Sequence, residues 1–262
     1  MKRLCCLILL LCLCSPLKVS AADALYYIKE SAKTRGLYNR AIEFITHKFP
    51  EAFEKRLVDS TEYIDLITNV FKDRGIPRDI AYLPLIESGF RPLAISNASA
   101  VGLWQFMKGT AIKYGLRIDG YVDERKDPVM STYAAADYLS DLYIKFGSWD
   151  LALAAYNAGE SRIHNMLKTN DNKRLPRNVY GYLAKFAAAS AIAQDPEEFG
   201  LTAPAGGRTT FVGYIEIKTN SIVSLRSIAK HYGTTVAALK RLNPALKNGA
   251  TPPYPYTIRL PG

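Results

Sequence analysis

One glutamate stands out in the sequence because of the residues around it. Glu87 follows an apolar stretch that is predicted to be helical and lies two residues before Gly89, a residue type that ends helices. A helix C-terminus repels a carboxylate and an apolar wall removes water from it, so both should raise the pKa of Glu87. A carboxylic acid that keeps its proton near neutrality can protonate a glycosidic oxygen. Taken alone, Glu87 could equally be a surface residue at a fraying helix end.

Two other segments carry side chains suited to binding a sugar. Residues 102–107 read G-L-W-Q-F-M and combine an indole, an amide and a thioether, while residues 155–159 read A-Y-N-A-G and end a predicted helix with a phenol and an amide. Each segment also has a structural interpretation, the first as hydrophobic core and the second as ordinary helix capping. Aromatic faces and amide or hydroxyl donors around one acid are nevertheless what a carbohydrate site requires.

These segments together resemble a known family. P-L-I-E-S-G-F around Glu87, the serine at Ser96, G-L-W-Q-F-M around Gln105 and A-Y-N-A-G around Tyr156 look like the successive motifs of soluble lytic transglycosylase domains, glycoside hydrolase family 23. The tryptophan in G-L-W-Q-F-M and the stretch V-D-E-R-K-D-P at residues 122–128 resemble the sequences of the membrane-bound murein transglycosylase D branch of this family. The resemblance runs from about residue 63 to residue 199 and implies a lysozyme-like α-helical fold.

The resemblance also implies a role for each matching residue. Glu87 would be the catalytic acid and then the base. Among the matching substrate-binding residues, Ser96 would help position the N-acetyl group or the acid, and Gln105 and Met107 would line the cleft. Tyr156 would hydrogen-bond near Glu87, and Asn157 would hold that turn or contact sugar. Tyr182 matches a tyrosine that precedes the last long helix. Two departures bear on the shape of the cleft. Asn97 and Ser99 replace a common proline and glycine, and residues 178–180 read N-V-Y instead of an acidic-Thr-Arg stretch.

The mechanism that follows uses a single acid. Asp119, Asp123, Glu124 and Asp127 cluster in a predicted loop and helix start, where capping and salt bridges explain them, so no second carboxylate is tied to the motifs. Glu87 would protonate the leaving oxygen of the MurNAc-GlcNAc β-1,4 bond, and the muramyl 6-hydroxyl would close a 1,6-anhydro ring without water. The alternatives are a goose-lysozyme-like muramidase that uses a water, and a non-catalytic peptidoglycan-binding protein.

The elements that position these residues are predicted to be helices as far as about Phe199. An apolar stripe at helical spacing comprises Tyr63, Leu66, Ile67, Val70 and Phe71. Asp127 followed by Pro128 is typical of a helix start, with aspartate as the N-cap and proline as the first residue. Alanines are frequent between residues 182 and 193, which lets helices approach closely. The expected fold class is mainly α: a lysozyme-like catalytic domain followed by a small α+β module.

The C-terminal segment has a different pattern. A linker at residues 202–210 precedes a predicted strand at 211–217, a helix capped by Ser224, a second helix that starts at Thr234 or Thr235, and a strand at 256–260. This βααβ order resembles a LysM module, although I-V-S at 222–224 replaces the usual Gly-Asp-Thr turn. From residue 202 onward there are eight basic residues and one acidic residue, Glu216, which predicts contact with an anionic wall or membrane surface.

The N-terminus predicts export. Lys2 and Arg3 precede an apolar run from residue 4 to 13 and the small residues at 20–22, a pattern typical of a signal peptide at residues 1–21. All four cysteines fall inside it, and Leu13 before Cys14 disfavours a lipid anchor. Residues 22–62 are predicted to form a helical extension before a catalytic domain at 63–201, a linker, and a module at 211–262. We expect a periplasmic or envelope protein whose partner is the glycan strand, without nucleic acid, metal or other cofactor.

Overall fold

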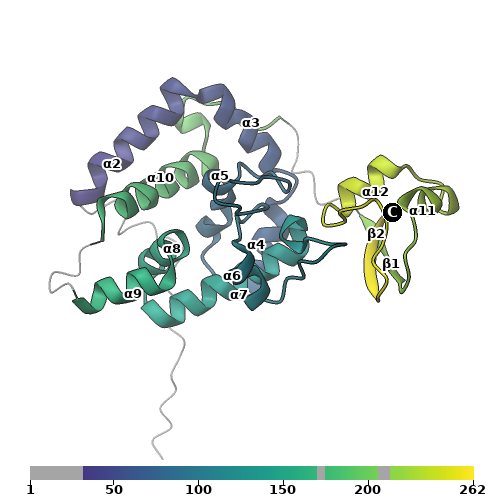
Figure 1. The fold of residues 1–262 in the computed structure, drawn as a ribbon. Coiled ribbons are helices and arrows are strands. Elements are labelled where there is room, and N and C mark those ends of the chain that lie inside the picture. Colours follow the sequence, from purple (N-terminus) through teal and green to yellow (C-terminus); the bar gives the residue numbers. More distant parts are fainter. Residues whose placement is uncertain (1–31, 170–174, 206–212) are drawn as a thin grey trace, which may run out of the picture.

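The computed structural model describes residues 32–169, 175–205 and 213–262. These residues form a helical body with a small module beside it (Figure 1). The predicted signal peptide with its four cysteines, residues 22–31, residues 206–210 of the linker and the predicted strand start at Phe211 lie outside the described residues. No helix among the described residues combines the length and the apolar character needed to span a bilayer.

The body is entirely helical in its regular structure over the described residues, as predicted. Its α-helices are α2 (Ala32–Glu43), α3 (Pro50–Ser60), α4 (Ile64–Asp73), α5 (Pro84–Glu87), α6 (Lys108–Lys113), α7 (Pro128–Phe146), α8 (Trp149–Ala158), α9 (Glu160–Thr169) and α10 (Arg177–Gln194). One π-helical turn, η1 (Phe44–Lys48), and three 3₁₀ turns, η2 (Arg78–Tyr82), η3 (Glu124–Lys126) and η4 (Glu197–Phe199), connect them.

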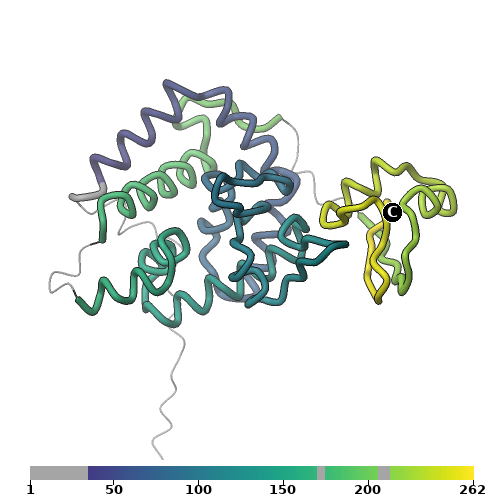
Figure 2. Tube along the Cα trace, in the orientation of Figure 1, coloured from purple at the N-terminus to yellow at the C-terminus, as the bar shows by residue number. Residues whose placement is uncertain are grey.

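Helix α10 is the packing centre of the body because its small side chains let other helices come close. Its alanines, among them Ala184, Ala187 and Ala188, are buried, and α10 packs against α2, α8 and α5. Figure 2 shows α2, in purple, lying along α10, in green, although about 150 positions of the chain separate them. Helix α10 therefore joins the N-terminal extension to the rest of the body in one core.

The predicted apolar stripe and helix start are both confirmed. Ile67, Val70 and Phe71 are buried on one face of α4, which packs against α7. Asp127 is the N-cap of α7, since one of its carboxylate oxygens accepts hydrogen bonds from the backbone N–H groups of Val129 and Met130 at 2.9 and 3.0 Å.

The C-terminal module has the predicted βααβ order. Strand β1 (Tyr214–Thr219) pairs antiparallel with β2 (Tyr256–Pro261), and helices α11 (Leu225–His231) and α12 (Val236–Leu242) lie between them in the chain. The side chains of Ser224 and Thr235 cap the two helices, which confirms Ser224 and decides between the two threonines. A separate small core built around Leu239 and Ile258 holds the module together.

The module is docked on the body through the loop that precedes α7. The backbone N–H of Asp123 donates to the Ala245 carbonyl, and the N–H of Lys247 donates to the Tyr121 carbonyl, both at 2.9 Å. These two bonds flank an isolated antiparallel bridge between residues 122 and 246. Residues 117–127, here called the docking loop, therefore continue into the module as a short strand-like contact.

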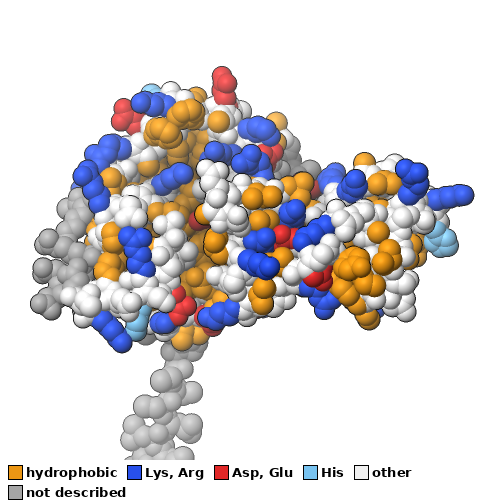
Figure 3. Space-filling view, in the orientation of Figure 1, with side chains coloured by type: hydrophobic (Ala, Val, Ile, Leu, Met, Phe, Trp, Pro, Cys, Tyr) orange, Lys and Arg blue, Asp and Glu red, His pale blue; other side chains and the backbone are white. Residues whose placement is uncertain are grey.

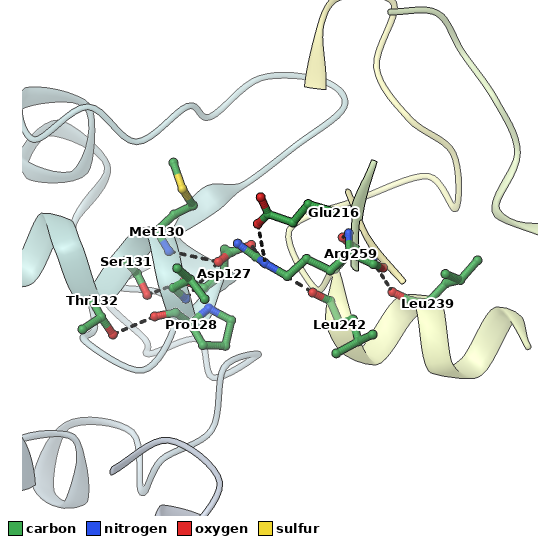
Figure 4. Close-up of polar contacts among 11 residues, drawn as sticks. Asp127, Pro128, Met130, Ser131, Thr132, Glu216, Leu239, Leu242 and Arg259 are labelled. Atoms are coloured by element: carbon green, nitrogen blue, oxygen red, sulfur yellow. Dashed lines mark hydrogen bonds and ion pairs between the residues drawn. The ribbon is translucent and has the colours of Figure 1, made fainter. Parts of the chain in front are cut away.

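A buried ion pair closes this interface (Figure 4). Arg259 of β2 reaches Asp127 with 2.6 Å between its Nη1 and the second carboxylate oxygen, and the two side chains are only 8% and 5% exposed. Glu216 of β1 lies 3.7 Å from the Nε of Arg259. A second pair across the interface, Arg241 with Glu62 at 2.9 Å, is largely exposed. Two of the module's basic residues thus face acids of this same chain.

Candidate active site

Glu87 is the last residue of α5, a helix of one turn that starts at Pro84. The chain then turns sharply, because Gly89 and Phe90 both adopt left-handed backbone conformations, with φ of 64° and 57°. The buried hydroxyl of Ser88 donates to the Leu103 carbonyl at 2.8 Å, which ties this turn to the G-L-W-Q-F-M segment. The half-buried carboxyl of Glu87 is thereby held where two of the predicted motifs meet.

Tyr182, predicted to precede the last long helix, lies inside α10 and is the hydrogen-bond partner of this carboxyl. Its phenol donates to Oε1 of Glu87 at 2.6 Å. Burial raises the pKa of Glu87, while the Tyr182 hydrogen bond and the positive charge of Lys185 lower it, and the net direction is upward. The predicted direction therefore agrees, but α5 has four residues and can contribute little dipole, so desolvation is the main cause.

Tyr156 lies close to Glu87 but bonds elsewhere. Its phenol donates to the Trp104 carbonyl at 2.5 Å. The pKa of Tyr156 is raised well above its usual value by burial and next by the negative charge of Glu87, which places the two groups within electrostatic reach. Tyr156 thus holds the G-L-W-Q-F-M segment against α8, and the direct bond to the carboxyl comes from Tyr182 instead.

The other predicted binding residues lie on a tightly wound segment between α5 and α6. The hydroxyl of Ser96 accepts from the Ala100 N–H at 3.1 Å, and Ser99 has a φ of 62°, which explains why glycine suits that position. Gln105 also has a positive φ, 50°, and its amide nitrogen donates to the Gly102 carbonyl at 2.9 Å. Met107 follows with its side chain 49% exposed. These residues share the segment that Ser88 and Tyr156 tie to Glu87.

Trp104 and Asn157 have contrasting environments. Trp104 is fully buried, with its ring 5.5 Å from that of Phe71 and its Nε1 donating to Thr132 at 3.1 Å, so it is a core residue. Asn157 is exposed near the end of α8, which stops at Gly159 with a φ of 93°. Asn157 is next to Tyr156 in the chain, and its side chain is accessible from solvent.

Arg125 of the docking loop supports this segment and was not found from the sequence. Its guanidinium forms a buried pair with Asp123 at 2.8 Å and donates to the carbonyls of Ser99 and Phe106, both at 3.2 Å. A Cβ on Gly102 would lie 1.8 Å from the carbonyl oxygen of Arg125, so only glycine fits there. The docking loop therefore contacts the predicted binding segment on one side and the C-terminal module on the other.

The remaining acids of the docking loop are structural, as predicted. Asp119 accepts from two backbone N–H groups of its own turn, at 2.8 and 2.9 Å, and Glu124 accepts from the N–H of Arg117 at 2.7 Å. Asp123 and Asp127 are paired with arginines. Among the described residues no group of three or more His, Cys, Asp and Glu side chains is arranged to hold a metal ion.

Comparison with known families identifies both parts of the chain. Residues 68–177 match the transglycosylase SLT domain family, and residues 214–262 match the LysM-like domain of lytic transglycosylase MltD. The chain thus contains a transglycosylase SLT domain followed by an MltD-type LysM-like domain.

Individual relatives agree with this assignment. The chain is 32% identical over 195 residues to membrane-bound lytic murein transglycosylase D of Escherichia coli, a match that covers 71% of this chain and 43% of that protein. It is 36% identical over 155 residues to peptidoglycan transglycosylase gp16 of Escherichia phage T7, covering 56% of this chain and 12% of that protein. The chain therefore spans less than half the length of these relatives.

One solved structure is also similar. An inactive mutant of lytic transglycosylase Slt from Pseudomonas aeruginosa matches 70% of this chain and 32% of its own, with 23% sequence identity and a TM-score of 0.42. This likeness is too distant to add to the fold described above.

Proposed function

We propose that this chain is a peptidoglycan lytic transglycosylase in which Glu87 is the only catalytic carboxyl. The observation that carries the proposal is the geometry of that group: a half-buried carboxyl with a raised pKa, held by the Tyr182 phenol at 2.6 Å. Burial favours the protonated form, which is the form that can donate a proton to a glycosidic oxygen. The names of the relatives support the same class of substrate.

A single carboxyl must do two jobs in this reaction. Glu87 first gives its proton to the oxygen that leaves with the next sugar, and the substrate's N-acetyl group stabilises the positive charge on the muramyl ring. The carboxylate of Glu87 then takes the proton of the muramyl 6-hydroxyl, whose oxygen bonds to the anomeric carbon and closes the 1,6-anhydro ring. Glu87 ends protonated, as it began, and no water enters.

The electrostatic neighbourhood of Glu87 supports this single-acid scheme. Enzymes that use a pair of carboxylates place them within about 5–10 Å of one another. Among the described residues, the pKa of Glu87 is shifted by burial, by the Tyr182 phenol and by the charge of Lys185, and by no second acid. The four acids of the docking loop already have structural partners.

Product analysis of digested peptidoglycan tests the proposal. Purified wall material is incubated with the chain, and the muropeptides are weighed by mass spectrometry. Products one water lighter than the reducing sugars are expected, whereas reducing ends would favour the muramidase alternative. Glu87→Gln should abolish cleavage, with Glu197→Gln as a control of the same chemical change at an exposed position of η4. Wall binding without any cleavage by the unmodified chain would favour a non-catalytic wall protein.

The place of action and the role of the module belong to the same proposal. The substrate lies in the cell envelope, so we infer that the exported chain works in the periplasm. The basic surface of the module is proposed to contact the anionic wall or membrane surface. That contact should weaken as salt rises, because exposed charges are screened beyond about 10 Å at 0.1 M salt.

A further inference from the structure

A groove of about 580 Å³ lies beside the candidate active site, between the N-terminal helices and α10. Its apolar lining includes Phe44, Phe49 and Ile86. Figure 3 shows hydrophobic side chains in a hollow of this face, next to α10, with lysine and arginine side chains along its edges. A volume of this size is typical of a site for a small ligand or a short peptide.

The groove is next to the catalytic carboxyl but outside the matched catalytic family. Two of its lining residues, Ile86 and Gly181, directly precede Glu87 and Tyr182 in the chain, so the groove begins at the pair that forms the 2.6 Å hydrogen bond. Most of its other walls come from residues 37–56 and 185–189, whereas the SLT match covers residues 68–177. The N-terminal extension thus adds a surface that the SLT match does not account for.

The charge of the groove is entirely positive. Arg40, Arg56 and Lys185 line it, and none of its lining residues is acidic. No ion pair joins any of the three to an acid within the described parts of the chain, and Arg56 instead donates to the Leu85 carbonyl at 3.3 Å. Burial, and after it the neighbouring charge of Arg56, lowers the pKa of Lys185, and the carboxyl of Glu87 offsets only part of this shift. Crowded cations of this kind are stabilised by an anionic ligand.

The apolar part of the groove is equally unusual for a free surface. Phe44 and Phe49 are 51% and 52% exposed, and their ring centroids lie 4.9 Å apart. Phe44 is the first residue of η1, a π-helical turn, and Phe49 follows its last residue; such turns are frequent at functional sites. A ligand that fits must therefore offer carboxylates to the cations and small apolar groups to the two rings.

We propose that this groove binds the peptide stem that muramic acid carries, an amide-linked chain with small apolar residues and free carboxylates. This inference rests on the proposed function. The stem is attached to the sugar on which the reaction takes place, so it must leave the cleft close to Glu87, where the groove begins. A membrane surface would also supply anionic headgroups, but it is flat and is not attached to the sugar that reacts at Glu87.

Two substrates separate this inference from the proposed function. One is polymeric peptidoglycan strands with their stems, and the other is the same strands after an amidase has removed the stems. The unmodified full chain should cleave both, with a lower KM for the strands that carry stems. If it cleaves neither, the proposed function fails, whereas equal KM values for the two substrates overturn only the stem site.

Arg40→Gln is the decisive variant, because Arg40 is an exposed residue of α2 that lines the groove and takes no part in the hydrogen bond between Tyr182 and Glu87. Its KM on stem-bearing strands should rise about fivefold, the equivalent of one ionic contact of about 1 kcal/mol, and its KM on stripped strands should stay within about twofold of that of the unmodified chain. Lys55→Gln is the matched control, since Lys55 is an exposed cation of α3 that does not line the groove. Phe49→Ala should give the same selective loss without any change of charge.

Two results would overturn the assignment. Equal effects of Arg40→Gln on both substrates would mean that Arg40 acts on the glycan or on the fold. A second assay uses vesicles of phosphatidylglycerol: if Arg40→Gln and Phe49→Ala release the chain from these vesicles and leave the KM for stem-bearing strands unchanged, the groove faces a lipid surface.

Discussion

The ion pair between Arg259 and Asp127 should dominate the stability of the docked module. Replacement of Arg259 by methionine keeps the length and the apolar stem of the side chain but removes the charge. It leaves a carboxylate that is 5% exposed beside an apolar group. Breaking one side of a buried pair costs about 3–5 kcal/mol. Asp127 retains two backbone N–H donors at 2.9 and 3.0 Å, so we expect the lower end, about 3 kcal/mol.

Proteolysis in increasing urea can measure this loss, because both tryptophans of the chain, Trp104 and Trp149, lie in the body. Their fluorescence reports on the body, and cleavage of the module reports on its release. In Arg259→Met the module should become cleavable at much lower urea than the tryptophan transition. Arg241→Met is the matched control, since Arg241 is 64% exposed in its pair with Glu62 and should lose no more than about 1 kcal/mol.

A double variant completes the test. Asp127→Asn retains a good N-cap for α7 but has no charge. Combining it with Arg259→Met therefore leaves no buried carboxylate without its partner, since Glu216, the other acid beside Arg259, is 52% exposed. The double variant should therefore be more stable than Arg259→Met alone. If Arg259→Met shifts the release of the module no further than Arg241→Met does, or if the two changes simply add, the pair does not hold the module and the reasoning is wrong.

Three further predictions follow from the site and the body. Tyr182→Phe removes a hydrogen bond that lowers the pKa of Glu87, so the pKa of Glu87 should rise and the basic limb of the pH-rate profile should move to higher pH. The kcat should fall roughly 10- to 100-fold. A basic limb that does not move would contradict this prediction. Gly102→Ala should lower the free energy of unfolding by about 3 kcal/mol or more, because its Cβ would overlap the backbone carbonyl oxygen of Arg125. The control Gly109→Ala, in α6, places its Cβ in open space and should stabilise the fold slightly. Similar melting temperatures for the two variants would refute the argument. Burial raises the pKa of Asp150 to about 6, and one of its carboxylate oxygens has no hydrogen-bond partner. The charge of Asp150 therefore lowers the free energy of unfolding as pH rises from about 4 through 6. Asp150→Asn should raise the free energy of unfolding by about 1–2 kcal/mol at pH 7 and leave it unchanged below pH 4, as measured by urea unfolding at both pH values.

Local signals in the sequence account for much of the fold. The N-caps at Asp127, Ser224 and Thr235 are short-range features, because each side chain bonds to a backbone N–H two or three residues ahead. The apolar stripe of α4 is a periodicity within one helix. Such local patterns can be read without knowing the tertiary structure. For this reason the predicted order of helices and strands agrees with the structure.

Contacts between distant segments were not accessible in the same way. The sequence predicts the Tyr156 phenol near the acid and places Tyr182 only before the last long helix. It could not show that Tyr182 bonds to the carboxyl, since Tyr182 lies 95 positions from Glu87. The pairing of Asp127 with Arg259 spans 132 positions, and aspartate before proline is already explained by helix capping. One carboxylate oxygen of Asp127 follows the local rule, and the other depends on the packing of a second domain.

In the proposed mechanism, the balance of forces on Glu87 explains how one carboxyl can act first as acid and then as base. Burial alone favours the protonated form, because a carboxylate is costly to form where water is largely excluded. The Tyr182 phenol and the positive charge of Lys185 act in the opposite direction, because both stabilise the ionised form. A group that must give a proton and later take one back works best when neither form is strongly favoured. The placement of Tyr182 and Lys185 on the same helix, three residues apart and therefore on one face, lets α10 impose both corrections at once.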